Sequence, residues 1–308
     1  MNQPTYEGRA LPRPDEDLVD QGLAFDLETM DRRRVLRFVG LGAGAAILAA
    51  CGADGSKTSS TSSSTATSSA SGALTEIPDE TAGPYPGDGS NGPNVLTEDG
   101  IIRSDITSSF GDFSGTAEGV PATIELTVLN LADGAAFAGA AVYVWHCDRG
   151  GNYSLYSEGA TDQNYLRGVR IADAAGTVSF TSIFPACYSG RWPHIHFEVY
   201  PDQESLSDST KAIATSQIAI PQEACNAVYA TSGYDQSVSN LAQISLTSDN
   251  VFGEDGGATQ LATMSGDVAS GYTIALTAAI DLTTTPSAGA APGGGGPGGA
   301  PPGGRATS

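Results

Sequence analysis

The chain is 308 residues long and strongly acidic, with 14 Lys and Arg against 35 Asp and Glu and a net charge of −21. So acidic a protein disfavours nucleic acid and anionic lipid headgroups as partners. Its four cysteines show no Cys-x-x-Cys or similar spacing, so a cysteine-based metal site is not expected.

The first 50 residues are typical of an export signal. Three arginines at 32–34 precede an uncharged run, 38–50, that is too short for an ordinary membrane-spanning helix. Residues 1–50 therefore predict a twin-arginine lipoprotein signal region. The run ends in Leu-Ala-Ala-Cys51, which resembles a lipobox. We expect cleavage before Cys51, lipidation of its thiol, and anchoring to the outer face of the cytoplasmic membrane, with a retained transmembrane segment as the alternative.

Two segments of biased composition enclose the predicted folded domain. Residues 51–75 are dominated by Ser, Thr, Ala and Gly, which predicts a flexible tether. Residues 284–308 form a Gly/Pro-rich tail that we expect to be disordered. The domain is therefore predicted to span residues 76–283, a length compatible with a single core.

Within this range, short alternating segments separated by turn residues predict strands, and no long segment has a strong helical period. Strands at this spacing predict an all-β fold, a β-sandwich. The expected strands are residues 122–130, 140–147, 177–183, 194–200, 212–220, 243–247 and 272–281.

Two of the three histidines in the chain stand one residue apart on a predicted strand. Side chains at i and i+2 of a strand share a face, so His194 and His196 point the same way and could hold one metal ion. Tyr188 and Tyr153 each follow a predicted turn. A phenol becomes a ligand only where a strongly charged cation displaces its proton. Two phenolates and two imidazoles would suit a hard ion such as Fe(III), whereas the alternative is a satisfied pair of histidines beside structural tyrosines.

The segments around these residues resemble the intradiol ring-cleavage dioxygenases, the family of protocatechuate 3,4-dioxygenase and catechol 1,2-dioxygenase. The resemblance covers about residues 76 to 282. Its most specific element is the paired tyrosine and His-x-His set with an arginine, Arg191, three residues before the first histidine. The similar segments are 80–85, 144–148 with 153–154, 165–168, 173–176 with 180–183, 188–196 and 215–217.

The resemblance implies a metal site and residues around it. Tyr153, Tyr188, His194 and His196 would be the ligands of one Fe(III) per chain. Arg191 would stabilise negative charge that develops during the reaction, and Tyr188 would leave the metal as substrate binds. Gln217 would support the arginine, and Pro84 and Tyr85 would line the substrate mouth.

The implied activity is cleavage of a catecholic ring by dioxygen to a cis,cis-muconate-type dicarboxylate. The alternatives are a non-catalytic metal- or aromatic-binding β-sandwich lipoprotein and a structural surface protein. The ring substituents and the oligomeric state stay open. A carboxylated catechol would need a local cation, for which Arg103, Arg149, Arg167 and Arg170 are candidates.

Five further residues have a predicted structural role. We expect His146 to be structural rather than a ligand. Glu198 shares the face of the two histidines and is predicted to be a solvated edge charge. With Cys51 lipidated, a Cys187–Cys225 disulfide is preferred in an exported protein, which leaves Cys147 as a buried thiol.

Overall fold

The computed structural model describes residues 5–6, 9–10 and 74–283 of the chain. The chain divides into two compact units, Met1–Gly72 and Ala73–Ser308. In the first unit, strands β1 (Thr5–Tyr6) and β2 (Arg9–Ala10) pair in an antiparallel ribbon.

The predicted export signal, the lipidation site Cys51 and most of the tether lie outside the described residues, as does the predicted tail. In the described parts of the chain, no helix is long and apolar enough to cross a membrane.

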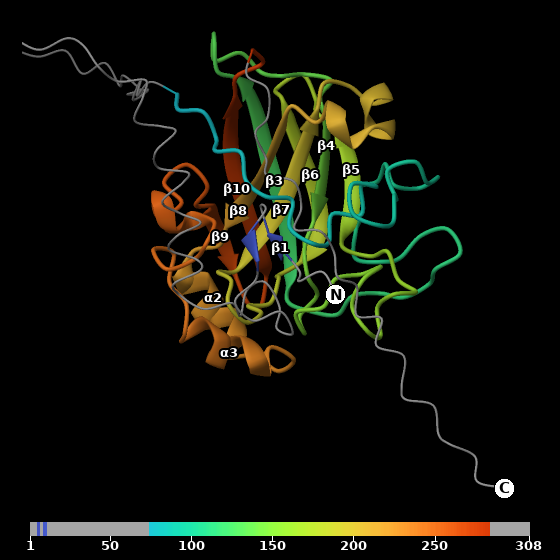
Figure 1. The fold of residues 1–308 in the computed structure, drawn as a ribbon. Helices are drawn as coiled ribbons and strands as arrows, with labels where there is room; N and C mark the ends of the chain where they lie inside the picture. The colour runs from blue at the N-terminus through green and yellow to red at the C-terminus, as the bar shows by residue number, and fades with distance from the viewer. Residues whose placement is uncertain (1–4, 7–8, 11–73, 284–308) are drawn as a thin grey trace, which may run out of the picture. The chain divides into compact units, whose positions relative to one another are not determined.

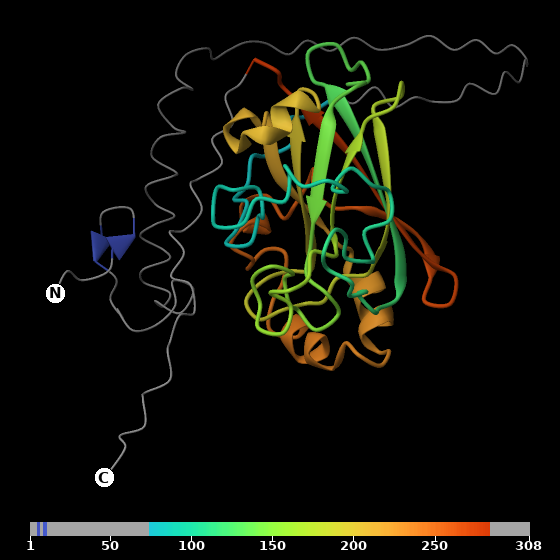
Figure 2. The same cartoon turned by 90° about the vertical axis from the view of Figure 1, so that its right-hand side faces the viewer.

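The second unit contains two four-stranded sheets that pack face to face, so the predicted all-β sandwich is confirmed (Figures 1 and 2). One sheet has the strand order β6-β3-β10-β9 and the other has the order β5-β4-β7-β8. All neighbouring strands are antiparallel except β3 and β10, which are parallel. The strands are β3 (Pro121–Asn130), β4 (Ala141–Trp145), β5 (Arg167–Ile171), β6 (Thr177–Ile183), β7 (His194–Tyr200), β8 (Ala214–Ala219), β9 (Thr263–Asp267) and β10 (Gly271–Ile280).

Six of the seven expected strands are present, and the seventh, 243–247, is wrong. That segment follows helix α3 (Asp235–Leu241) as turns, in which the Ser245 and Ser248 side chains hydrogen-bond to each other and to nearby backbone groups. Serine side chains that bond the backbone locally compete with a strand ladder. A second short helix, α2 (Gln222–Tyr229), precedes α3, and three short 3₁₀ segments are η2 (Glu204–Ser207), η3 (Ser209–Lys211) and η4 (Phe252–Glu254).

The sequence did not predict strands β5 and β9. In β5 a glycine and two arginines interrupt the apolar pattern, and in β9 almost every residue is exposed. Neither strand therefore has the alternation from which a half-buried strand is predicted.

The main hydrophobic core lies between the sheets. In β7, Ile195, Phe197 and Val199 point into it, as the alternation predicted. All seven residues of β7 are nevertheless buried. The opposite face of this sheet is covered as well, and a second cluster built around Tyr143, Trp145 and Val95 packs there.

The cover over this outer face comes from the segment 74–106, which we call the covering segment. It bonds first to β10 through Ile77 and then to β8, where the Glu80 N–H donates to the Thr215 carbonyl. It crosses the face and bonds to β5 at the other edge, through Ile101 and Arg103, before it reaches β6. Figure 1 shows its cyan-to-teal trace crossing the sheets. The segment thus encloses the face that carries both histidines.

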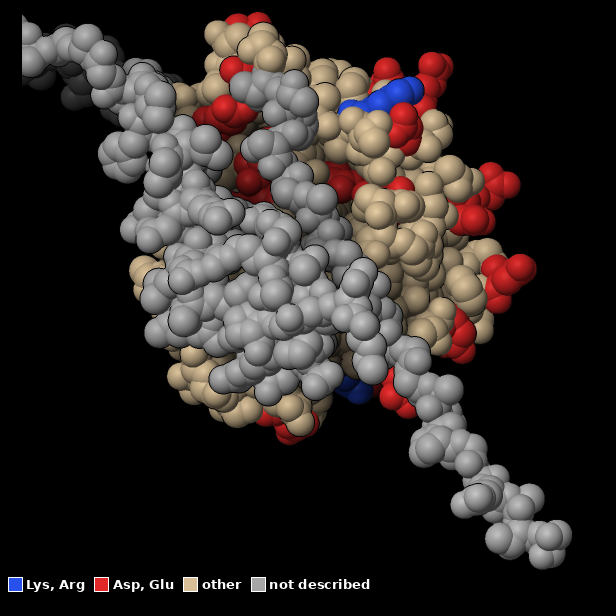
Figure 3. All heavy atoms as spheres, in the orientation of Figure 1, with Lys and Arg blue, Asp and Glu red and all other residues tan. Residues whose placement is uncertain are grey.

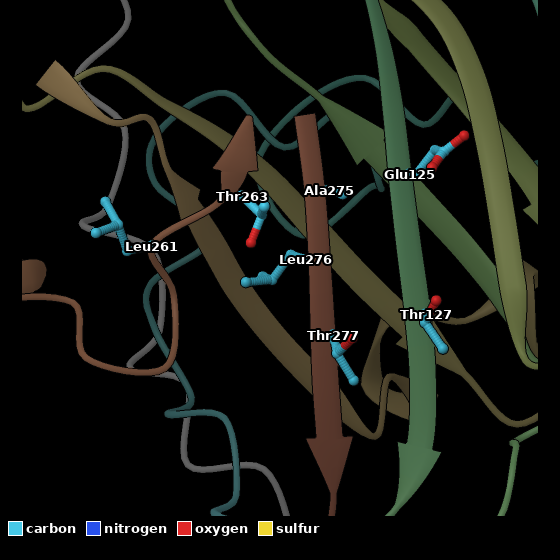
Figure 4. Close-up of a pocket in the computed structure, with 7 residues that line it drawn as sticks. All are labelled: Glu125, Thr127, Leu261, Thr263, Ala275, Leu276 and Thr277. Carbon is cyan, nitrogen blue, oxygen red and sulfur yellow. The ribbon is translucent and has the colours of Figure 1, made fainter. Parts of the chain in front are cut away.

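The outer face of the other sheet is open. Glu125 and Thr127 of β3, Thr277 of β10 and Thr263 at the start of β9 surround a shallow depression of about 330 Å³ (Figure 4). None of the predicted ligands borders it, so this hollow is not the site that the sequence predicts.

Candidate metal and catechol site

The two histidines meet on the covered face of the β5-β4-β7-β8 sheet. His194 and His196 are buried, and their Nε2 atoms lie 3.1 Å apart. The His196 ring stacks on Trp145 of β4, its cross-strand partner, with ring centroids 4.8 Å apart. The His194 Nδ1 donates to the Trp192 carbonyl at 2.5 Å. That bond leaves the Nε2 lone pair of the neutral ring facing His196.

The two tyrosines approach the same point from loops. The Tyr188 hydroxyl lies 3.1 Å from His194 Nε2, and the ring centroids of Tyr153 and Tyr188 are 5.9 Å apart. Tyr153 also lies edge-on to His196, with centroids 6.2 Å apart. The structure therefore brings together all four residues that the sequence predicts as ligands.

The protonation of these groups fits a strongly charged metal ion. Burial lowers the pKa of His194 to about 3 and that of His196 well below its usual value, so both imidazoles are neutral. Burial also raises the pKa of Tyr188 to about 12 and that of Tyr153 further above its usual value. Only a nearby multivalent cation would deprotonate such phenols.

One orphaned polar atom supports the same interpretation. The Tyr153 hydroxyl is buried without a hydrogen-bond partner, and such an atom usually needs a partner in a folded protein. Because Tyr153 and His196 lie beside a converging set of nitrogen and oxygen donors, the residues fit a bound metal ion. Among the described residues, no group of three or more His, Cys, Asp or Glu side chains forms another candidate metal site.

Arg191 lies next to this group, where it is held by two partners. Its Nε donates to Asp249 at 3.0 Å, and its Nη2 donates to the Gln217 Oε1 at 2.6 Å. Gln217, opposite His196 on β8, in turn donates to the Thr81 carbonyl at 2.9 Å. Burial alone would lower the pKa of Arg191, but Tyr188 and Asp249 outweigh it and raise this pKa. The predicted pairing of Arg191 with Gln217 is therefore present.

Asp249 was not predicted. It lies 58 residues beyond Arg191 in a turn, so no local pattern connects the two. Its carboxylate also accepts from the Trp192 N–H at 2.7 Å. Burial would raise the pKa of Asp249, yet Arg191 and the Trp192 N–H hold it below its usual value.

Arg167 anchors the segments around the site. This fully buried guanidinium donates to Ser154 through Nε and Nη2, to the Pro86 carbonyl and the Tyr143 hydroxyl through Nη1, and to the Tyr85 carbonyl through Nη2. All these bonds are between 2.8 and 3.1 Å. Arg167 thus connects Ser154, the residue after the predicted ligand Tyr153, to the covering segment.

The covering segment reaches the site at residues 83–85. Gly83 has a φ of +71°, and a Cβ there would lie 3.3 Å from His196 Cε1, so the backbone approaches the histidine closely. Tyr85 is 36% exposed, and its ring centroid is 5.0 Å from that of Tyr153. Pro84 is exposed beside it. These positions match a lining role for Pro84 and Tyr85, which stays a prediction.

His146 lies on the opposite face of the sheet, between the two sheets. Its Nδ1 donates to the Cys147 carbonyl at 2.8 Å, so its Nε2 accepts from the Ser182 hydroxyl of β6 at 2.7 Å. Burial lowers its pKa to about 4. The histidine joins the sheets as a neutral group, in agreement with a structural role.

Glu198 is not a solvated edge charge. Its side chain is 3% exposed and accepts a hydrogen bond from the Tyr200 hydroxyl at 2.8 Å. The covering segment buries this end of the face, which the β7 pattern alone could not reveal.

The predicted Cys187–Cys225 disulfide is absent from the structure. Both residues are buried free thiols, as is Cys147. The Cys187 Sγ points to the Arg191 carbonyl at 3.5 Å and the Cys225 Sγ to the Ile220 carbonyl at 3.9 Å, so each thiol turns to its own neighbouring backbone. The expected burial of Cys147 is confirmed.

Comparison with known proteins bears on the family and the fold of the chain. The sequence model of the Dioxygenase family matches residues 92–203. No curated protein matches the chain. The structure is similar to that of an intradiol ring-cleavage dioxygenase from Tetranychus urticae, with a TM-score of 0.55 and 23% identity over 70% of this chain and 98% of that one.

Two further solved structures are less similar. Hydroxyquinol 1,2-dioxygenase from Pseudomonas putida DLL-E4 has a TM-score of 0.38 and 17% identity over 59% of this chain and 62% of its own. Catechol 1,2-dioxygenase from Acinetobacter sp. ADP1 has a TM-score of 0.38 and 19% identity over 59% of each chain. These scores add nothing to the fold assignment. The family match and the shared sandwich fold confirm the resemblance of this chain to the intradiol ring-cleavage dioxygenases, and with it the prediction of an enzyme of that kind.

Proposed function

We propose that the protein binds one Fe(III) through Tyr153, Tyr188, His194 and His196 and cleaves a catecholic ring between its two hydroxylated carbons. The observation that carries the proposal is the convergence of two neutral imidazoles and two buried phenols on one point. When bound, Fe(III) would supply the Lewis acid that holds the catecholate and makes its ring reactive toward dioxygen.

The reaction balances without a further reductant. One catechol and one dioxygen give one cis,cis-muconate-type dicarboxylic acid. The carbon–carbon bond between the hydroxylated carbons and the oxygen–oxygen bond both break, and each of these carbons gains one oxygen atom. The substrate supplies all the electrons.

The two tyrosines are suited to different tasks. Tyr153 is only 2% exposed and packs against Tyr85, whereas Tyr188 is partly buried. With a metal bound, the more accessible phenolate would be the one able to take up a catechol proton on its oxygen. We therefore assign Tyr188 as the proton acceptor and Tyr153 as the permanent ligand.

Arg191 is placed to stabilise negative charge on the substrate. Asp249 and Gln217 fix the guanidinium, which costs no reorganisation when charge develops. Its own charge is near enough to Tyr188 to lower the pKa of that phenol against the effect of burial.

We also propose that the protein is an exported lipoprotein anchored through Cys51. The support is the sequence alone: the arginine run, the short apolar run and the Leu-Ala-Ala-Cys ending. Mass spectrometry of the membrane-extracted protein would give a mature N-terminus at a lipidated Cys51. An unprocessed N-terminus would contradict this assignment.

The test of the proposed function is a visible spectrum with metal analysis of the purified full chain. We expect about one iron per chain, a tyrosinate-to-Fe(III) band, and a shift of that band when catechol is added without oxygen. Admitting ¹⁸O₂ should place both labelled atoms in the ring-opened acid.

The alternative is a non-catalytic protein that binds a metal or an aromatic molecule. It would bind iron and catechol but form no product. A protein that stays colourless after iron loading would contradict the metal site itself.

A further inference from the structure

The charges around the site bear on which catechols can enter. Residues 74–283 contain only six Lys and Arg side chains, so each can be accounted for. They are Arg103, Arg149, Arg167, Arg170, Arg191 and Lys211.

Three of these cations are paired with other groups. Arg167 uses its guanidinium on Ser154, Tyr143 and two backbone carbonyls of the covering segment. Arg103 donates to the carbonyls of Arg167, Asn164 and Ser108. Arg149 forms an exposed ion pair with Glu118.

Two others lie away from the site. Arg170 pairs with Val142 across β5 and β4, and Val142 points into the core between the sheets, on the face opposite the histidines. Lys211 ends η3, just before the end of β8 that pairs with Val199, whereas His194 pairs with the other end of that strand. Neither can reach a substituent of a bound catechol without rearrangement of the sheet.

The remaining cation, Arg191, is already neutralised. Asp249 pairs with it directly, and Glu80 of the covering segment lies near enough for Arg191, Asp249, Glu254 and Asp255 to influence its ionisation. Glu80 is the residue before Thr81, whose carbonyl accepts from Gln217. We call the surroundings of Arg191 the rim of the site. The rim therefore carries the carboxyl groups of Glu80, Asp249, Glu254 and Asp255 around one paired guanidinium.

The pKa of Glu80 indicates how favourable a further carboxylate would be at this rim. Its pKa is raised to about 8, chiefly by burial; Arg191 lowers this pKa, and the carboxyl groups of Asp255, Glu254 and Asp249 raise it. A substrate carboxylate at the rim would meet the same loss of water and the same repulsion. Figure 3 shows the wider pattern, since acidic side chains outnumber basic ones on the described part of the visible face.

We propose that the site selects catechols without an anionic ring substituent, neutral or cationic, and that Glu80 is a specificity-determining residue. The proposal rests on the proposed catechol chemistry and specifies its substrate class. The aromatic residues beside the site agree with this proposal. The ring centroid of Tyr85 lies 5.2 Å from that of Tyr156 and 5.0 Å from that of Tyr153. Such ring faces accept uncharged rings and organic cations.

The test compares two substrates of nearly equal size that differ in charge: 3,4-dihydroxybenzamide and 3,4-dihydroxybenzoate. With the iron-loaded full chain at neutral pH, kcat/KM for the amide should exceed that for the benzoate at least about 30-fold. The reason is that a negative charge placed without a partner beside other carboxylates lowers affinity by about one to two orders of magnitude. Unsubstituted catechol should be turned over as well. A benzoate that is used within threefold of the amide would overturn the proposal.

Two variants assign the effect to the rim. Glu80→Gln removes one carboxyl, and at pH 9, where Glu80 is ionised, it should narrow the amide-to-benzoate ratio about three- to tenfold. Glu125→Gln removes a carboxylate from the open face of the other sheet and should leave the ratio unchanged. An unchanged ratio in Glu80→Gln would remove Glu80 from the selection.

Binding separates failure of this inference from failure of the proposed function. Anaerobic calorimetry with each compound measures selection even where no ring opens. Preferred binding of the amide without product would contradict the dioxygenase reaction and keep the charge selection. Equal binding of amide and benzoate, or no binding of either, would overturn the charge selection.

Discussion

The outer faces of the two sheets differ in what covers them. On the β6-β3-β10-β9 sheet, Glu125, Thr127 and Thr277 face an open surface. On the β5-β4-β7-β8 sheet, two histidines, a glutamate and a glutamine are buried beneath the covering segment. Burying a polar group is costly unless it gains a partner. The contrast shows that the covering segment turns one sheet face into an enclosed polar region, while the other face stays open.

The largest effect should follow from removing a ligand on the covered face. His196→Ala should reduce bound iron to a small fraction of one per chain and ring cleavage below detection. Iron analysis and oxygen uptake check this. Glu125→Gln on the open face is the matched control and should keep both values. Full iron occupancy in His196→Ala would contradict the assignment of the metal site to the covered face.

Arg191→Lys should come next. Lysine keeps the positive charge but lacks the fork that bonds Asp249 and Gln217 together. By analogy with loss of one preorganised donor, kcat should fall about 10²–10³-fold. The iron content and the visible band should stay near wild type. A kcat within a few-fold of wild type would exclude a role in charge stabilisation.

Arg167→Met tests how much a buried anchor of the covered face contributes to stability. The substitution leaves the Tyr85, Pro86 and Ser154 oxygens without their buried donor. The free energy of unfolding should fall by about 3 kcal/mol, as for other broken buried charge networks. Denaturant titration measures it. Arg149→Met, which breaks an exposed ion pair, should cost less than about 1 kcal/mol. Equal losses would contradict the anchoring role of Arg167.

The smallest effect is a pH dependence between the sheets. The pKa of His146 falls from 6.5 to about 4 on folding. Between these pH values, His146 binds a proton in the unfolded chain but not in the folded chain. Stability from this group is present above pH 6.5 and is lost as pH falls toward 4, by about 1.4 kcal/mol per pH unit at most. The unfolding free energy of His146→Gln should therefore depend less on pH in this window. Parallel pH profiles for both proteins would contradict the assignment.

The sequence could predict the fold class and the shared face of His194 and His196 because both depend on short spacings, whereas the four predicted ligands as a set came from the family resemblance. The alternation in β7 placed Ile195 inside and His194 outside, and the tyrosines followed recognisable turns. Partners far apart in the chain were beyond such patterns. Asp249 reaches Arg191 from 58 residues away. Glu198 looked exposed because its burial depends on residues about a hundred positions earlier.

The Cys187–Cys225 pairing failed for a related reason. Counting cysteines gives the number of thiols available but not the direction of each side chain. Each Sγ turns toward a carbonyl of its own neighbourhood instead.

The covering segment has a consequence for how the protein ages. The same stretch of chain occupies backbone positions along β8 and β5 and brings Gly83 against His196. Exposed strand edges recruit other chains into aggregates. A protease that trims the protein past residue 103 would therefore expose both edges of one sheet and remove the mouth of the site. Loss of turnover and loss of solubility should then appear together, as one event in the lifetime of the molecule.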